Sequence, residues 1–106
     1  MAKSEKLPRV RDAICSERLK VVADPTRLAV LRLLLTQGTQ TVAEIQRRLH
    51  VEQSLLSHHL QVLRDAGMVK GMRRGKSVLY ALSAAASVRV QAHAIDLGCC
   101  EIAFRR

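Results

Sequence analysis

The chain contains three cysteines, and two of them, Cys99 and Cys100, are neighbours near the end of the sequence. Adjacent Cα atoms lie about 3.8 Å apart, whereas an unstrained disulfide requires roughly 4.4–6.8 Å. A vicinal pair is therefore a poor structural crosslink. Together with Cys15 the count is odd, which in a reducing compartment favours free thiols or ligands over a disulfide framework.

Three chemical roles are open to Cys15, Cys99 and Cys100. Three thiolates suit a soft, thiophilic ion, and As(III), Cd(II), Pb(II) and Zn(II) are the candidates. Thiols of lowered pKa near Lys or Arg could instead be oxidised and act as a redox switch. A cysteine on an apolar stripe, such as Cys15, could also be a buried core residue without any reactivity.

The charge of the chain indicates a polyanionic partner. Eighteen Lys and Arg residues oppose nine Asp and Glu residues, which gives a net charge of +9 and a pI near 10.5. Such an excess is typical of nucleic-acid binding, although a solvated basic surface is the plainer alternative. Because Tyr80 and Phe104 are the only aromatic residues, the chain cannot build a stacking platform for unpaired bases. Double-stranded DNA is the favoured partner.

Length and hydropathy restrict the class of protein further. A chain of 106 residues is one domain with a modest core, which a second copy sharing an apolar face would reinforce. The longest apolar run, residues 28–35, is interrupted by Arg32 and is far shorter than the ~18 residues of a membrane span. No apolar block follows the basic N-terminal residues, so no secretory signal is expected. We expect a cytoplasmic homodimer without a membrane partner.

Periodicity predicts four helices before the middle of the chain. After a mobile segment at 1–9, helices are expected at 10–23, 25–36, 41–49 and 53–66. Asp24 followed by Pro25 is a helix start signal, and Thr41 with Glu44 is a capping box. The short break between the last two helices is typical of a helix-turn-helix.

The remaining residues predict a β-hairpin and a closing helix. Segments 68–70 and 78–82 flank the glycine-containing basic loop 71–77, which favours a hairpin. A last helix is expected from Ser83 or Ser87 to about Leu97, with Val88, Ala92 and Ile95 on one side and Gly98 as its terminator. The predicted fold is mostly α with a small β-hairpin. The predicted domain covers residues 10–97, and a C-terminal tail at 98–106 carries the vicinal cysteines.

Helix 53–66 divides into a polar and an apolar face. The inner arc holds Leu55, Leu56, His59, Leu60, Val62, Leu63 and Ala66. The outer arc holds Gln53, Ser54, Ser57, His58, Gln61, Arg64 and Asp65. Hydroxyl, amide and imidazole groups bind base edges and phosphates in the major groove, although the same groups also face water on ordinary surface helices. We expect His58 to contact DNA and His59 to be a satisfied inner histidine.

The order of these motifs resembles the ArsR/SmtB family of winged helix-turn-helix repressors. The likeness covers roughly residues 12–97 and is carried by Asp24-Pro25-Thr26-Arg27-Leu28, by Leu56-Ser57-His58-His59-Leu60 with its exit Gly67-Met68-Val69, and by the basic hairpin closing on 78–82. The resemblance implies a homodimer paired through its first and last helices, which blocks promoters until an inducer lowers its DNA affinity. It also implies that Gln53, Ser54, Ser57 and His58 face the major groove, and that the wing cations Arg73, Arg74 and Lys76 lie along the flanking minor groove or its phosphates. The position of Gln61 on the outer arc adds it to the expected DNA-contacting set.

The family's two familiar sensing sites are missing from this chain. The first site is a Cys-x-Cys pair, and Thr41 and Ala43 occupy its two cysteine positions here. The second site pairs Asp-x-His with another histidine further along the chain. Here Gln91-Ala92-His93 lacks the Asp, and Phe104 stands in place of the second histidine. If the first and last helices pair across the dimer, as the resemblance implies, Cys15 of one chain would approach Cys99 and Cys100 of the other and could form a different site with them.

The function that the sequence predicts is a sequence-specific repressor released from double-stranded operator DNA by a thiophilic ion. A thiol-redox or non-sensing DNA-binding repressor is the alternative, followed by a protein–protein interaction module. An enzyme is not expected, because loop 71–77 is one residue short of a phosphate-binding loop and no helix follows it.

Overall fold

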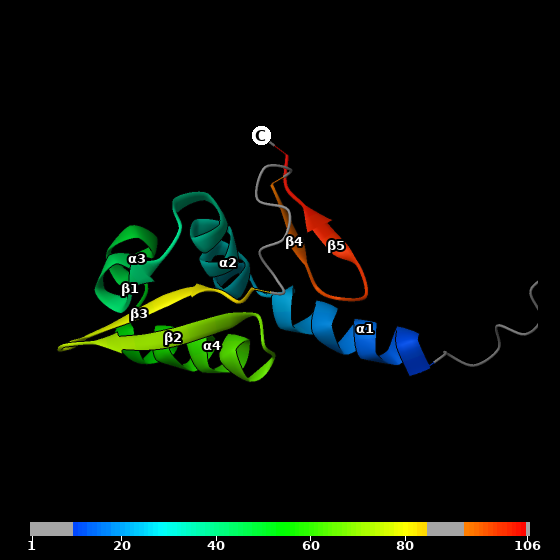
Figure 1. Ribbon diagram of the computed structural model, residues 1–106, viewed down its shortest axis with the longest axis horizontal. Helices are drawn as coiled ribbons and strands as arrows, with labels where there is room; N and C mark the ends of the chain where they lie inside the picture. The colour runs from blue at the N-terminus through cyan, green and yellow to red at the C-terminus, as the bar shows by residue number, and fades with distance from the viewer. Residues whose placement is uncertain (1–9, 85–92, 106) are drawn as a thin grey trace, which may run out of the picture.

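The computed structural model describes residues 10–84 and 93–105, and Figure 1 shows their arrangement. The described elements are α1 (Val10–Val22), α2 (Pro25–Gln37), β1 (Gln40–Thr41), α3 (Val42–Leu49), α4 (Gln53–Asp65), β2 (Val69–Arg74), β3 (Ser77–Leu82), β4 (Ala94–Asp96) and β5 (Glu101–Ala103). The four helices and the β2–β3 hairpin confirm the predicted mixture of elements. The predicted mobile segment 1–9 lies outside the described residues.

Helix α2 is the centre of the core. It begins as predicted, with the Asp24 carboxylate accepting a hydrogen bond from the backbone N–H of Arg27 and with Pro25 at the first helical position. Four of its side chains are buried: Val30, Leu31, Leu34 and Leu35. The leucine-rich sequence is thus the hydrophobic element on which the other helices pack.

Helices α3 and α4 form the predicted helix-turn-helix. The capping box is present, because Thr41 Oγ1 accepts from the Glu44 N–H while the Glu44 carboxylate accepts from the Thr41 N–H. His50 takes a left-handed conformation with φ 54° and ends α3. Helix α4 buries its inner face through Leu56, His59, Leu60 and Leu63. The prediction was wrong for Leu55, which is 47% exposed because it lies at the edge of that arc.

The β2–β3 hairpin is longer than predicted. The strands pair from Val69–Leu82 to Arg74–Ser77, so that the loop contracts to a turn at Gly75 and Lys76. In Figure 1 this hairpin projects from the helices on the side away from α1. The short strand β1 pairs with β3 and completes a three-stranded sheet that the sequence did not reveal.

The expected closing helix is wrong for residues 94–97. Ala94–Asp96 forms β4, which pairs with β5 in an antiparallel hairpin. The turn is closed by a hydrogen bond from the Leu97 N–H to the Cys100 carbonyl, and Gly98 supplies its positive φ of 91°. Residues 98–103 form the turn and the second strand of this hairpin. The earlier part of the predicted helix, including Val88 and Ala92, lies outside the described residues.

Helix α1 is covered on one narrow side only. Val22 is its one buried residue, and Cys15 is half-buried. Val10, Ile14 and Leu19 are 78%, 50% and 41% exposed. None of the described helices has the length and apolar character needed to cross a bilayer.

Candidate functional sites

The outward face of α4 carries the polar side chains that the sequence singled out. All five are exposed: Gln53, Ser54, Ser57, His58 and Gln61. The opposite face of the helix packs into the core through Leu56, Leu60 and Leu63. Because burial of that face fixes the rotation of the helix, the polar face is held toward solvent.

A groove of about 510 Å³ runs between α3, α4 and the β2–β3 hairpin. Gln53, Ser57 and Gln61 line it from α4, and Lys76 lines it from the turn between the two strands. The fold therefore brings hydrogen-bonding groups of the helix and a cation of the hairpin to one surface, although they are separated in the sequence. Ser54 and His58 are exposed on α4 without lining this groove.

Glu52 holds the N-terminus of α4 and was missed by the sequence analysis. Its carboxylate accepts from the N–H groups of Ser54 and Leu55, both at 3.1 Å, and from the Ser54 hydroxyl at 2.6 Å. These hydrogen bonds, led by the one from the Ser54 hydroxyl, lower the pKa of Glu52 from its ordinary value. Glu is not a preferred N-cap residue, so its type gave no signal. The Ser54 hydroxyl is thus engaged within the protein.

Gln61 is also held by neighbours on its own helix. Its amide N–H donates to Asp65 Oδ1 at 2.7 Å, and its carbonyl accepts from Arg64 Nη2. The other guanidinium nitrogen of Arg64 lies 3.4 Å from the Tyr80 hydroxyl of β3. A contact from Gln61 to another molecule would therefore require exchange of these hydrogen bonds.

The cations of the hairpin are exposed. Arg73 and Arg74 lie on β2, and Lys76 lies in the turn, so the structure places the three on one projecting element. Such exposed cations suit contacts to phosphate oxygens more than readout of bases.

The two adjacent histidines of α4 lie in different environments, as predicted. His58 is exposed, whereas His59 is only 8% exposed. His59 Nδ1 lies 3.2 Å from Arg27 Nη1, and its Nε2 lies 3.8 Å from the Asp24 carboxylate. The prediction of a satisfied inner histidine is confirmed.

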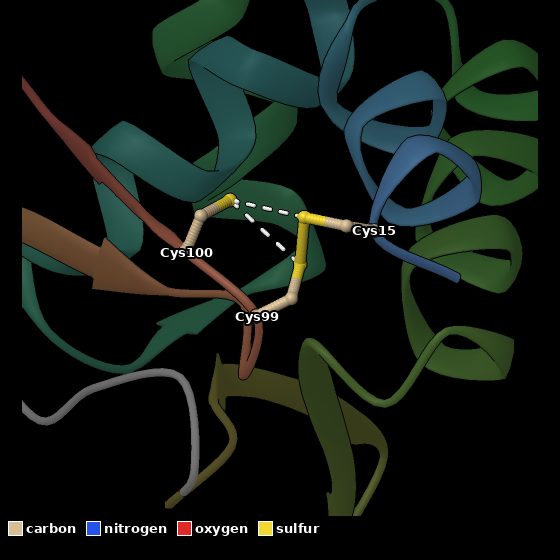
Figure 2. A group of neighbouring side chains, drawn as sticks. All are labelled: Cys15, Cys99 and Cys100. Atoms are coloured by element: carbon tan, nitrogen blue, oxygen red, sulfur yellow. Dashed lines mark hydrogen bonds between the residues drawn. A yellow bond between two sulfur atoms is a disulfide. The ribbon is translucent and has the colours of Figure 1, made fainter. Parts of the chain in front are cut away.

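The three cysteines form one cluster between α1 and the turn that joins β4 to β5 (Figure 2). Cys15 and Cys99 are joined by a disulfide, with their Cα atoms 5.6 Å apart. Cys100 is a free thiol, and its Sγ lies 3.5 Å from Cys15 Sγ and 3.8 Å from Cys99 Sγ. All three sulfur atoms lie within 4.8 Å of one another.

Two expectations about the cysteines are corrected by this arrangement. Cys15 meets the vicinal pair of its own chain, because the β4–β5 hairpin folds back onto α1, so no partner is needed to assemble the cluster. The expectation of free thiols alone was also wrong, since Cys15 and Cys99 are bonded. The fold brings the Cα atoms of Cys15 and Cys99 to 5.6 Å, which lies within the range of an unstrained disulfide. The Cα atoms of the adjacent residues Cys99 and Cys100 are too close together for one.

The helix-turn-helix, the projecting hairpin and the polar outer face of α4 together define a winged helix-turn-helix protein. A family model described as "Bacterial regulatory protein, arsR family" matches residues 24–70. The transcriptional repressor BigR from Xylella fastidiosa is structurally similar, with a TM-score of 0.68, 31% identity and coverage of 78% of this chain and 82% of that one. The chain belongs to the ArsR family.

Curated relatives match about three fifths of this chain. The transcriptional repressor SmtB of Mycobacterium tuberculosis is 43% identical over 67 residues, which cover 63% of this chain and 49% of the relative. The arsenical resistance operon repressor of Escherichia coli is 38% identical over 64 residues, which cover 60% of this chain and 55% of the relative. The chain thus spans about half the length of these relatives. They are named as regulators of transcription and not as enzymes.

Proposed function

We propose that this chain is a cytoplasmic homodimeric repressor that binds double-stranded operator DNA and is released by a thiophilic ion bound to its cysteines. The observation that carries the proposal is the common surface of α4 and the hairpin, where Gln53, Ser57 and Lys76 line one groove. Both curated relatives described above are named as repressors.

The chemistry of the side chains on this surface determines which part of the DNA each one contacts. Ser57 and His58, exposed on α4, contact base edges in the major groove. Arg73, Arg74 and Lys76 contact phosphates beside that groove, which the net charge of +9 favours. Ser54 and Gln61 contribute after exchanging the hydrogen bonds that now hold them.

The exposed apolar residues of α1 support dimerisation. Val10, Ile14 and Leu19 leave large apolar surfaces in water on one helix, and a second copy would bury them. A two-fold dimer would present two α4 helices to half-sites about one helical turn, roughly 34 Å, apart.

The cysteine cluster supports release by a soft ion. Three sulfur donors within 4.8 Å of one another fit As(III), Cd(II) or Pb(II) as a shallow thiolate site. Zn(II) fits less well, because a structural zinc site takes four ligands and the described residues offer no fourth Cys, His or carboxylate in this group. The Cys15–Cys99 bond must be reduced first, since binding requires thiolates.

The disulfide itself supports a second sensing mode. Oxidation of Cys15 and Cys99 joins α1 to the β4–β5 turn, and reduction separates them. A thiol oxidant could therefore act on DNA affinity through the same cluster, without any ion.

Gel retardation tests the proposed function directly. The probe is duplex DNA from upstream of the protein's own gene, at low and at physiological salt, with scrambled duplex as the competitor. We expect retardation of the specific probe to survive the competitor, and arsenite added to the reduced protein to release it. Equal competition by both duplexes would refute specific DNA binding. Retention of the complex at saturating arsenite, cadmium and lead would refute release by an ion.

A further inference from the structure

Arg27 connects the end of α1 to the inner face of α4. Its Nε donates to the Val21 carbonyl at 2.6 Å, and its Nη1 lies 3.2 Å from His59 Nδ1. Its backbone N–H donates to the Asp24 carboxylate, which fixes the start of α2 beneath it. One half-buried guanidinium thus contacts two helices that are distant in the sequence.

His59 can receive this contact in one arrangement only. All guanidinium nitrogens are donors, so Nδ1 must accept and the hydrogen of the neutral ring must lie on Nε2. Its Nε2 lies 3.8 Å from the Asp24 carboxylate. Because the imidazole is buried against Arg27, it fixes the rotation of α4 at the residue next to His58, which faces solvent.

Helix α1 depends on few attachments. Within its own span Val22 is the one buried residue. Cys15 is bonded to Cys99 of the β4–β5 turn, and Arg18 Nη1 donates to the Leu97 carbonyl of the same turn. The Val21 carbonyl bound by Arg27 lies on the same helix, less than two turns beyond Cys15. The cysteine and the carbonyl that Arg27 holds therefore belong to one helix.

We propose that Arg27 is a positioning residue that transmits the state of the cysteine cluster to α4. Reorganisation of the reduced Cys15 around a bound ion moves α1, the Val21 carbonyl withdraws from Arg27, and the guanidinium no longer holds His59 in place. The polar face of α4 then loses the fixed rotation that DNA readout needs. The inference deepens the proposed function and rests on it for the step from α4 to DNA. Its support is a continuous set of contacts instead of proximity alone.

Hydrogen exchange tests this transmission without DNA. The amides of residues 53–65 are compared in the dithiothreitol-reduced protein before and after saturating arsenite is added. In the wild type we expect arsenite to speed their exchange several-fold, whereas in Arg27→Gln the exchange is already fast before arsenite is added. Arg32→Gln is the matched control, because it removes a cation from the same helix. The Arg32 guanidinium lies over the Phe104 ring, whereas that of Arg27 contacts His59. An equal response in wild type and Arg27→Gln, or none in the wild type, would overturn the inference.

A second arm measures the coupling to DNA. Fluorescence anisotropy with the duplex from upstream of the gene gives Kd before and after arsenite is added to reduced protein. Allosteric coupling of ordinary size predicts a rise in the wild-type Kd of about 5- to 150-fold, against less than about twofold in Arg27→Gln. Arg27→Lys, which keeps the charge but cannot reach both partners with one planar group, should also lose the response.

The outcomes separate the two proposals. If the wild type does not bind the duplex, the proposed function fails while the exchange data still judge the role of Arg27. If the wild type is released by arsenite and both Arg27 variants are released to the same extent, the positioning role is refuted and the repressor function stands. Circular dichroism and arsenite titration of the thiols show that the variants are folded and still bind the ion.

Discussion

Cys15 of α1 is covalently joined to Cys99, 84 residues further along the chain, and Cys100 lies beside the bond with its thiol free. The same sulfur atoms therefore have two exclusive uses. A disulfide occupies two of the three donors, so an ion and the oxidised bond cannot coexist at the cluster. Sensing by ion and sensing by oxidation can be separated because Cys100 belongs to the first use only.

Cys100→Ser should separate the two kinds of response. It removes one of three ligands, so we expect arsenite to bind the reduced protein much more weakly and to fail to release DNA. The Cys15–Cys99 disulfide should still form, as thiol counting under denaturing conditions would show. Cys99→Ser/Cys100→Ser should lose the response to both arsenite and oxidant. A double variant that is released normally by both agents would leave the cluster a structural role only.

Arg73→Ala/Arg74→Ala should weaken binding to all duplexes and reduce its dependence on salt. Each phosphate contact removed lowers the slope of log K against log salt by roughly 1. The measurement is a series of anisotropy titrations between low and physiological salt. Lys20→Ala is the control, since it removes an exposed cation from α1, far from the hairpin in the sequence. An unchanged slope in the double variant would place the hairpin outside the interface.

Ser57→Ala and His58→Ala should act on specific binding. Base contacts are worth about 1–3 kcal/mol of discrimination, so operator affinity should fall by one or two orders of magnitude while affinity for scrambled duplex hardly changes. Competition titrations with both duplexes measure the ratio. Ser16→Ala, at an exposed position of α1, is the matched control. Equal losses for both duplexes would indicate phosphate contacts at these positions.

Asp24 should contribute to the loss of stability in acid. The hydrogen bond from the backbone N–H of Arg27 is the largest cause that lowers the pKa of Asp24 below its ordinary value of 3.8; burial opposes it, and the positive charge of Arg27 adds to it. A carboxyl whose pKa is lower in the folded state stabilises the fold above the ordinary value, and this contribution is lost as the pH falls through the folded value. Asp24→Asn keeps a good helix cap without the charge.

Urea unfolding at pH 6 and pH 3 measures this contribution. The wild type should lose more free energy of unfolding between the two pH values than Asp24→Asn does. Equal losses in both proteins would show that Asp24 is not among the groups that set the acid limit.

Local signals explain which elements could be read from the sequence. Asp24-Pro25 and the Thr41–Glu44 capping box act within one helical turn, so the starts of α2 and α3 were predictable. Helix α4 was predictable because its apolar side chains recur at helical spacing. The exposure of Ser57 and His58 followed from the same spacing.

The C-terminal hairpin could not be read in this way. Strand β4 has three residues, and an apolar run that short is compatible with a helix or a strand. The strand conformation is set by pairing with β5 and by burial of Ile95 and Leu97 against the core. Both interactions involve residues outside the run itself. The contact of Cys15 with Cys99 depends on the same hairpin, which explains why the sequence analysis assigned it to two different chains.

A sensor contained within one polypeptide behaves differently on dilution from one divided between subunits. Since all three sulfur atoms belong to the same chain, the affinity of the reduced protein for arsenite should stay constant as the protein concentration is lowered past dimer dissociation. A site shared between subunits would weaken over that range by mass action. Each subunit of an assembled repressor would then register the ion on its own, with a stoichiometry of one ion per chain.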